Sequence, residues 1–398
     1  MTRVVLLLLF AIHPVVDFQD YLAETDCDDA AFGPGGDVYL ACHSQNGEDM
    51  DARVVRMRQG NVVWGTTLRG SAYDGAFRVN VDRQGAAYVV GFTKSPDFLG
   101  RFDAHAMRTF LVKLDANGKV DFATLLDAEN GDALAVDQAA GVAYVGGTQQ
   151  GHAFVAKVRV QDGSVSTTRF SGEGKEKVTG ISLDGRGGLY VTGYTESAEY
   201  FGHKVNGRSD AFLARLHTFL LSLDYGLLLG GSGEDSGWGV ATGRDGSAVV
   251  AGITASNDFP VSPHAFQRHL GGASDAFVAK VVNGRLVWAT YYGGSAADEA
   301  GYDGGDVKVD SEGTIWLAGQ THSTDLPVTR GTYAGGDGDG FVAAFSADGH
   351  RLLFGSYFGG AGRDLLEGLD VAHRRVIATG LTNSPHGRFQ AMRVGLRY

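Results

Sequence analysis

Cysteine and proline are scarce in this chain, and no strongly basic segment occurs in it. The 398 residues include 2 cysteines and 7 prolines, against 60 glycines. The scarcity of proline and the lack of a G-x-y period exclude a collagen-like fibre. With 43% hydrophobic and 10% aromatic residues the chain can bury a core, which argues against disorder. The glycines are therefore expected at turns between many short strands.

Positive charge is in deficit as well. The chain has 34 Lys and Arg residues against 46 Asp and Glu residues, a formal net charge of −12. A phosphate backbone would be repelled, so we expect no nucleic-acid partner, and anionic membrane surfaces are disfavoured for the same reason. No internal run approaches the ~18 apolar residues of a membrane-spanning helix, so we expect no membrane insertion. We expect a monomer.

The longest apolar run is short and lies at the N-terminus. Residues 4–12 are apolar, follow Arg3 and precede Pro14. This run is too short to span a bilayer but suits the hydrophobic region of a signal peptide. We predict that residues 1–13 are a signal peptide, and that the protein is exported to the periplasm, the cell surface or the extracellular space. A buried first strand is the alternative.

A strand that ends in Gly-x-Thr recurs along the chain, as in Tyr190-Val191-Thr192-Gly193-Tyr194-Thr195. The glycine position of this motif falls at residues 42, 91, 147, 193, 252, 319 and 380, with Cys42 replacing glycine in the first copy. Each copy follows a strand that closes on a glycine turn, and precedes an Asp-Ala-Phe-type strand and an aromatic-rich strand. Four short antiparallel strands at a period near 50 are typical of β-propeller blades. We predict an all-β fold, with one seven-bladed propeller of four-stranded antiparallel blades over residues 14–398.

The two ends of the chain are expected to share the last blade. The last repeat stops after its third strand, residues 389–396. Residues 15–22 have the pattern of a fourth strand and align with residues 62–69 without a gap. We predict that this N-terminal strand completes the last blade, which closes the ring and leaves no open sheet edge.

The repeats resemble a known family. The units Asp-Ala-Phe-Val-Ala-Lys (275–280), Tyr-Tyr-Gly-Gly-Ser (291–295), Val-Asp-x-x-Gly (309–313) and Ala-Gly-x-Thr (251–254), together with the loop of residues 257–267, are similar to the SBBP-type bacterial β-propeller repeat. The resemblance implies an exported bacterial protein with a propeller fold. It implies no general catalytic motif.

Catalytic signatures are missing. The chain has no His-Glu-x-x-His, no Walker-type phosphate loop and no Gly-x-Ser-x-Gly. The strands expected to line the central channel, between residues 77 and 369, contain no histidine, and their charged members are Arg78, Lys308 and Glu367. They show no carboxylate pair suited to glycoside hydrolysis. We therefore expect a channel poorly equipped for catalysis.

One face should combine aromatic and acidic side chains. The long loops after the second strands and the loops between blades lie on the same face, since the strands run up and down. The candidate binding residues on these loops are Phe98, Phe102, Tyr200, Phe201, Asp235, Phe259, Phe266, Asp298, Asp303 and Tyr333. Such a composition suits the binding of a protein or a glycan. Two alternatives stay open: the aromatic rings fill gaps between blades, and the acids are solvated loop tips.

Metal ligands are few. We expect no cofactor, with calcium as the alternative, because residues 335–340 alternate glycine with aspartate and offer hard oxygen ligands. Asp82, Asp184 and Asp310 precede glycine turns, where an aspartate bonds the backbone of its own turn, so we interpret them as structural.

The two cysteines fall on one predicted hairpin. Cys27 and Cys42 lie on the first and second strands of the first repeat, which turn near Gly35 and Gly36. Such a turn places residue 27 opposite about residue 44. A disulfide is therefore plausible but off-register.

Two functions follow from these observations. The leading hypothesis is an exported, non-enzymatic binding or scaffold module. The competing hypothesis is a propeller enzyme acting on an extracellular saccharide or ester, with its catalytic groups on loops. A convergent cluster of acids or histidines in a funnel would favour the enzyme, and a flat aromatic face would favour binding.

Overall fold

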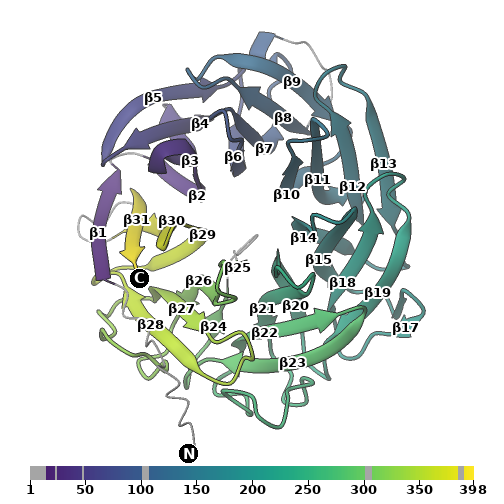
Figure 1. Cartoon of the computed structure of the whole chain (residues 1–398), viewed down its shortest axis with the longest axis vertical. Helices are drawn as coiled ribbons and strands as arrows, with labels where there is room; N and C mark the ends of the chain where they lie inside the picture. Colours follow the sequence, from purple (N-terminus) through teal and green to yellow (C-terminus); the bar gives the residue numbers. More distant parts are fainter. Residues whose placement is uncertain (1–14, 23–24, 47–48, 101–106, 301–306, 384–389) are drawn as a thin grey trace, which may run out of the picture.

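The chain folds into a ring of blades around a central channel (Figure 1). The computed structural model describes residues 15–22, 25–46, 49–100, 107–300, 307–383 and 390–398. Over these ranges the helical elements are two short 3-10 turns, Pro34–Gly36 and Phe98–Gly100. Seven antiparallel sheets form the blades, so the predicted all-β, seven-bladed propeller is confirmed. None of the helical segments that the structure describes has the length and apolar character needed to cross a membrane.

The blades follow one another along the chain, each beginning with its innermost strand. Blade 1 holds β2 (Thr25–Phe32), β3 (Val38–Asn46), β4 (Asp49–Arg58) and β5 (Asn61–Leu68). Blade 2 holds β6 (Asp74–Val81), β7 (Ala87–Thr93), β8 (Arg108–Leu114) and β9 (Val120–Leu126). Blade 3 holds β10 (Asn130–Asp137), β11 (Val142–Gln149), β12 (His152–Arg159) and β13 (Val165–Phe170). Blade 4 holds β14 (Glu176–Leu183), β15 (Gly188–Thr195), β18 (Asp210–His217) and β19 (Leu223–Leu229), and a side hairpin pairs β16 (Glu199–Tyr200) with β17 (His203–Lys204).

The remaining blades continue this order. Blade 5 holds β20 (Asp235–Thr242), β21 (Ala248–Thr254), β22 (Asp275–Val282) and β23 (Arg285–Tyr292). In blade 6 two short pieces, β24 (Asp298–Glu299) and β25 (Val307–Val309), both pair with β26 (Ile315–Thr321), and β27 (Asp339–Phe345) and β28 (Leu352–Phe358) complete the sheet. Blade 7 holds β29 (Asp364–Ala372), β30 (Arg375–Thr382) and β31 (Gln390–Arg397).

The ring is closed by the N-terminal strand β1 (Val15–Leu22). It pairs antiparallel with β31, from Val15 opposite Arg397 to Leu22 opposite Ala391. Figure 1 shows this purple strand beside the yellow last blade. Blade 7 therefore has four strands drawn from both ends of the chain, as predicted. The expectation that no sheet edge stays open is wrong, because among the described residues the outermost strand of each blade pairs on its inner side only. The predicted signal peptide, residues 1–13, lies outside the described residues.

A β-bulge at a fixed place in the innermost strand explains the glycine of the Gly-x-Thr motif. In blade 5 the pairing of β20 with β21 shifts between Gly237 and Gly239. A Cβ on Gly252, the motif glycine opposite, would lie 2.0 Å from the carbonyl oxygen of Ser236. No side chain fits there, and a bulge also bends the strand and increases its twist. The glycine is thus a packing requirement of blades 2 to 7, whereas Cys42 takes its place beside the bulge of blade 1.

The core lies between the faces of neighbouring blades. The phenylalanine of each Asp-Ala-Phe-type strand is almost completely buried in it, namely Phe110, Phe154, Phe212, Phe277 and Phe341. Tight turns connect the first strand of each blade to its second strand, and in three of these turns an aspartate accepts backbone hydrogen bonds as predicted. Asp82 Oδ1, for example, accepts hydrogen bonds from the backbone N–H groups of Gln84 and Ala86.

Candidate functional site

The acids at the start of the innermost strands are buried structural groups. Asp235 Oδ2 accepts hydrogen bonds from the Gly231 N–H (2.8 Å) and from Ser256 Oγ (2.7 Å). Asp298 Oδ2 is held in the same way by the equivalent glycine and serine of blade 6. Both aspartates are fully buried. They attach the loop between blades to the second strand, so neither is a surface binding residue, and the alternative of solvated loop tips is wrong for them too.

Three of the predicted aromatic binding residues are buried as well. Phe98, Tyr200 and Phe259 are 1%, 4% and 3% exposed. Phe259 lies against Phe277, with ring centroids 4.6 Å apart, and Phe98 stacks on the phenylalanine of its own blade in the same way. These rings belong to the hydrophobic clusters between neighbouring blades, which is the alternative left open above. The prediction of an exposed aromatic face is wrong for these three.

The other predicted binding residues divide into two groups. Phe201, Phe266 and Tyr333 are half-buried and pack against the hydrophobic core. Phe102 and Asp303 lie outside the described residues.

One predicted pair, Tyr200 and Phe201, does line a groove. It has a volume of about 520 Å³ and lies between the end of β13, the β16–β17 hairpin and residues 221–223. Phe201 adopts a φ of +53°, a left-handed conformation that is uncommon for a bulky residue. Arg169 and Glu199 bring opposite charges to the lining. The groove therefore combines apolar, aromatic and charged groups.

A cluster of acids at the channel was missed by the sequence reading. Asp26 and Asp28 on β2 and Glu367 on β29 have carboxylate oxygens within 4.8 Å of one another. Asp28 Oδ2 also lies 3.1 Å from Nε2 of the buried His43. The sequence prediction did not count the innermost strand of blade 1 among the channel strands, so of these three acids it considered only Glu367. Ring closure then brings β2 beside β29.

Burial and mutual repulsion control the protonation of this cluster. Burial, together with the charge of Asp28, raises the pKa of Asp26 to about 7. Burial lowers the pKa of His43, but the charge and the hydrogen bond of Asp28 outweigh this, so the pKa of His43 is raised. The pKa of Asp26 thus lies in the range in which a carboxyl group can take up or release a proton near neutral pH. The three carboxylates are also oxygen ligands of the kind that calcium prefers.

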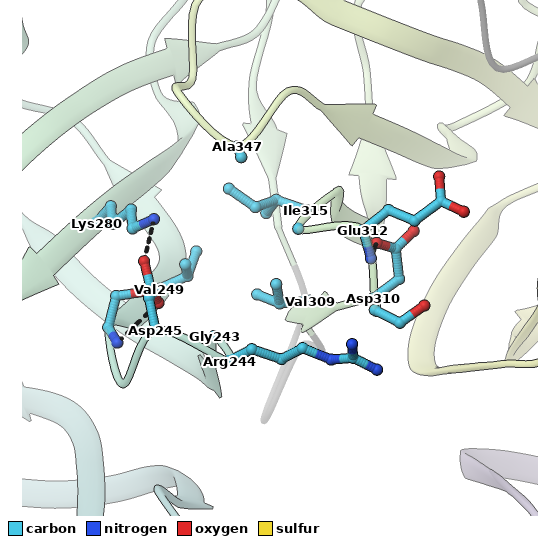
Figure 2. Close-up of a pocket in the computed structure, with 13 residues that line it drawn as sticks. Gly243, Arg244, Asp245, Val249, Lys280, Val309, Asp310, Glu312, Ile315 and Ala347 are labelled. Carbon is cyan, nitrogen blue, oxygen red and sulfur yellow. Dashed lines mark hydrogen bonds and ion pairs between the residues drawn. The ribbon is translucent and has the colours of Figure 1, made fainter. Parts of the chain in front are cut away.

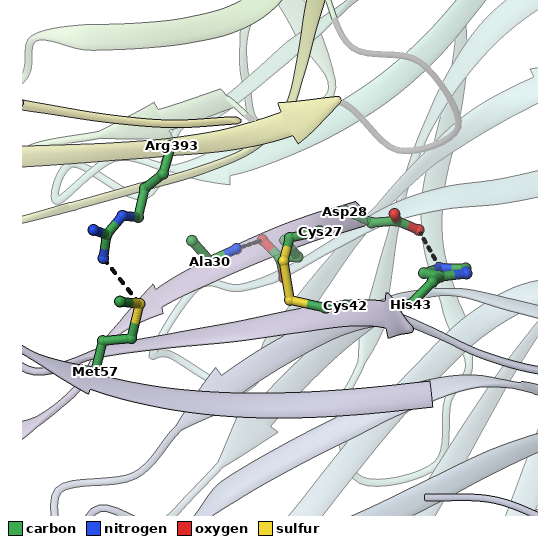
Figure 3. Close-up of a disulfide and its surroundings, with 8 residues drawn as sticks. Cys27, Asp28, Ala30, Cys42, His43, Met57 and Arg393 are labelled. Carbon is green, nitrogen blue, oxygen red and sulfur yellow. Dashed lines mark hydrogen bonds and ion pairs between the residues drawn. A yellow bond between two sulfur atoms is a disulfide. The ribbon is translucent and has the colours of Figure 1, made fainter. Parts of the chain in front are cut away.

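A disulfide adjoins the cluster. Cys27, between Asp26 and Asp28 in sequence, is bonded to Cys42, and both cysteines are fully buried (Figure 3). The two residues lie directly opposite each other, so the predicted offset is wrong. The turn is centred on Gly35, half a residue earlier than expected, and a bulge at Asp28 removes the rest of the offset.

A separate cavity of about 230 Å³ lies between blades 5 and 6, beside their glycine turns (Figure 2). Its walls include Val249 and Lys280 of blade 5 and Gly313 of blade 6. The Lys280 Nζ donates a hydrogen bond of 3.0 Å to Asp245 Oδ2. Sequence reasoning did not single out this site.

Comparisons with known proteins support the fold but identify no family. No family model matches the chain. The Regulatory protein FlaEY of Caulobacter vibrioides is 28% identical over 187 residues, which are 46% of this chain and 19% of that protein. The chain thus spans about a fifth of that relative's length. The solved "Structure of Dos1 propeller" covers 93% of this chain and 77% of its own, with a TM-score of 0.51 and 9% identity. This likeness shows a propeller fold alone, and the SBBP-type repeat stays a prediction.

Proposed function

We propose that the protein is an exported, non-enzymatic binding or scaffold module, and that its partner is a protein. The observation that carries the proposal is the groove beside Tyr200 and Phe201. No strand of the described residues pairs with the outer edge of β13, so this edge offers backbone groups next to the groove. An extended peptide can add to such an edge while the groove accepts its side chains.

The buried disulfide supports export, because such bonds form and persist in oxidising compartments. N-terminal sequencing of the secreted chain tests this directly. A mature N-terminus close to residue 14 is expected, and an intact N-terminus would contradict export by a cleaved signal.

The binding proposal is tested with a surface-protein and glycan array probed with the purified chain. Glu199→Lys reverses a charge at the groove and should weaken capture of the protein partner at least ~10-fold, on the scale of a lost contact. Asp162→Lys makes the same type of change at an exposed turn of blade 3 and serves as the control. Equal capture by both variants would exclude the groove, and exclusive capture of glycans would exclude a protein partner.

The second candidate function is the predicted enzyme acting on a saccharide or ester, with the channel cluster in place of loop residues. The observation that favours it is the cluster of the Asp26, Asp28 and Glu367 carboxylates, in which the pKa of Asp26 is raised to about 7, in the range suited to general acid or base catalysis. Chromogenic glycosides and esters, screened between pH 4 and 8, should be cleaved by the wild type and not by Asp28→Asn. Absence of turnover in the wild type would remove this candidate.

A further inference from the structure

Five blades carry an aromatic residue at one position of the second strand, and in blades 1, 3 and 4 its hydroxyl donates a hydrogen bond to the next blade. It stands three residues before the motif glycine and is Tyr39, Tyr88, Tyr144, Tyr190 and Trp316 in blades 1, 2, 3, 4 and 6. In blade 1 the tyrosine hydroxyl donates to the carbonyl oxygen of Gly85 in the blade 2 turn, at 3.0 Å. In blade 4 it donates to the carbonyl oxygen of Gly246 in the blade 5 turn, at 2.9 Å.

In blades 1 and 4 a cation of the third strand covers the ring. Arg56 lies 5.5 Å from the centroid of Tyr39, and Arg215 lies 5.9 Å from that of Tyr190. A cation over an aromatic face is attracted by the electron density of the ring. Ring, cation and glycine carbonyl thus form a small tyrosine site between blades 1 and 2 and again between blades 4 and 5.

Blade 5 has this site without the ring. Val249 takes the tyrosine position, while Lys280 supplies the cation and Gly313 the turn glycine. The turn backbone is the same, with φ of +86° at Gly313 and +83° at Gly246. The cavity of about 230 Å³ lies where the ring would be, and Figure 2 shows the short Val249 side chain between Lys280 and the blade 6 turn.

A neighbouring indole also lacks its partner. In blade 1 the Nε1–H of Trp64 donates to the carbonyl oxygen of Ala116 at 3.1 Å. Trp288 is the equivalent residue of blade 5, since it pairs with Lys280 as Trp64 pairs with Arg56. Its Nε1 is buried and has no hydrogen-bond partner in the described part of the chain. The contact between blades 5 and 6 therefore lacks a hydrogen-bond partner for this indole as well as a ring to fill the cavity.

We propose that this cavity binds an external phenol ring in the place of the missing tyrosine. The ring lies beneath the Lys280 ammonium, which Asp245 holds in position. The phenol hydroxyl donates to the Gly313 carbonyl oxygen, as the tyrosine hydroxyls do to Gly85 and Gly246. Size permits this, because apolar cavities of about 150 Å³ already accept benzene. The site is separate from the groove of the proposed function and does not depend on it.

The test uses 4-methylphenol, the side-chain analogue of tyrosine, titrated into the wild-type protein by calorimetry and by melting temperature. Toluene, which has the same ring without the hydroxyl, should bind up to about tenfold more weakly, since it makes no hydrogen bond. Lys280→Met should weaken 4-methylphenol severalfold by removing the cation while retaining the side-chain length. No detectable binding of 4-methylphenol at millimolar concentration overturns the proposal, as does equal affinity for toluene.

Val249→Tyr supplies the ring from the chain itself. We expect it to abolish 4-methylphenol binding and to raise the melting temperature, as filling a cavity does. Val249→Ala keeps the cavity open and is the control that should still bind. Undiminished binding to folded Val249→Tyr contradicts the site, and if that variant does not fold, the toluene and Lys280→Met comparisons decide.

A third ligand, a blocked pentapeptide with one central tyrosine, distinguishes a tyrosine side chain of another protein from a free phenolic compound as the natural ligand. Tighter binding of the peptide than of 4-methylphenol assigns the site to a tyrosine side chain of another protein. Binding of 4-methylphenol alone assigns it to a free phenolic compound. Either result supports a phenol site, and failure of both ligands overturns it.

Discussion

Ser256 Oγ donates a hydrogen bond of 2.7 Å to Asp235 Oδ2, and both side chains are buried. The same bond joins Ser323 to Asp298 in blade 6 and Ser95 to Asp74 in blade 2. In each case the acid also accepts a backbone N–H from a glycine four residues earlier. In these three blades the arrangement fixes the loop that enters the blade to the end of its second strand.

Removing this acid should be costly. Asp235→Ala leaves the Ser256 hydroxyl and the Gly231 N–H without their acceptor in a buried site, which should lower the free energy of unfolding by about 2–4 kcal/mol. Urea denaturation measures the change. Asp127→Ala removes a carboxylate that is 75% exposed and should change stability little. Equal effects of the two substitutions would contradict the structural role of Asp235.

The disulfide should stabilise the first blade. Cys27 and Cys42 close a loop with a sequence separation of 15, for which the chain-entropy model gives about 3 kcal/mol. The double variant Cys27→Ala and Cys42→Ala should therefore unfold at lower denaturant concentration than the oxidised wild type. Mass spectrometry of the wild type without reductant should find no free thiol. Coincident unfolding curves for variant and wild type would contradict this stabilisation.

The N-terminal strand should be essential to the ring. Deleting residues 15–22 exposes the edge of β31 and removes the fourth strand of blade 7, so cooperative unfolding should be lost or the melting temperature strongly lowered. Deleting residues 1–13 alone should leave the melting temperature unchanged, since these residues precede the strand. An unchanged melting curve for the larger deletion would disprove closure by β1.

Stability should depend on pH through two buried acids between blades. Burial, with the charge of the acid across the junction, raises the pKa of Asp210 and of Asp339 to about 6. Asp235 is the acid whose charge acts on Asp210, and Asp364 is the one whose charge acts on Asp339. Unfolded aspartate titrates near 3.9, so the folded state binds these protons more tightly. The stabilisation that these two acids add to the free energy of unfolding is complete below about pH 4, is lost as the pH rises to about 6, and is absent at higher pH. Thermal melts should therefore show higher stability at pH 5 than at pH 7.5.

A neutral amide at these two positions should remove their share of the pH dependence, while Asp26 and Asp275, whose pKa values are also raised, keep theirs. Asp210→Asn with Asp339→Asn should raise the melting temperature at pH 7.5 by a few degrees and flatten the profile between pH 4 and 6, because one carboxylate oxygen of each acid makes no hydrogen bond to the described residues. Asp275→Asn is the contrasting control. Its oxygens accept the N–H groups of Gly271 and Gly272 and the Gln267 Nε2, so an amide loses acceptors there and should destabilise. Stabilisation by all three substitutions would point to a general charge effect.

Much of the architecture was determined by the sequence alone, because each blade repeats the same packing requirements. The glycine of the Gly-x-Thr motif, such as Gly252, follows from the close approach of a neighbouring carbonyl. The missing fourth strand at the C-terminus predicted its replacement by residues 15–22. Asp82 was assigned to its turn because its partners are two and four residues away. Local spacing and repetition suffice for features of this kind.

Only the tertiary structure decided what the individual side chains do. Asp235 and Phe259 have the composition of a binding face, yet the hydrogen bonds and rings that bury them come from other strands. Asp26 and Glu367 are separated by most of the chain and meet because the ring closes. The cavity beside Val249 exists because valine takes the position of the tyrosine that, in blades 1 and 4, bonds the turn of the next blade. A repeat pattern reports which positions are shared, whereas burial and empty space arise where blades pack, so they appear only in the folded ring.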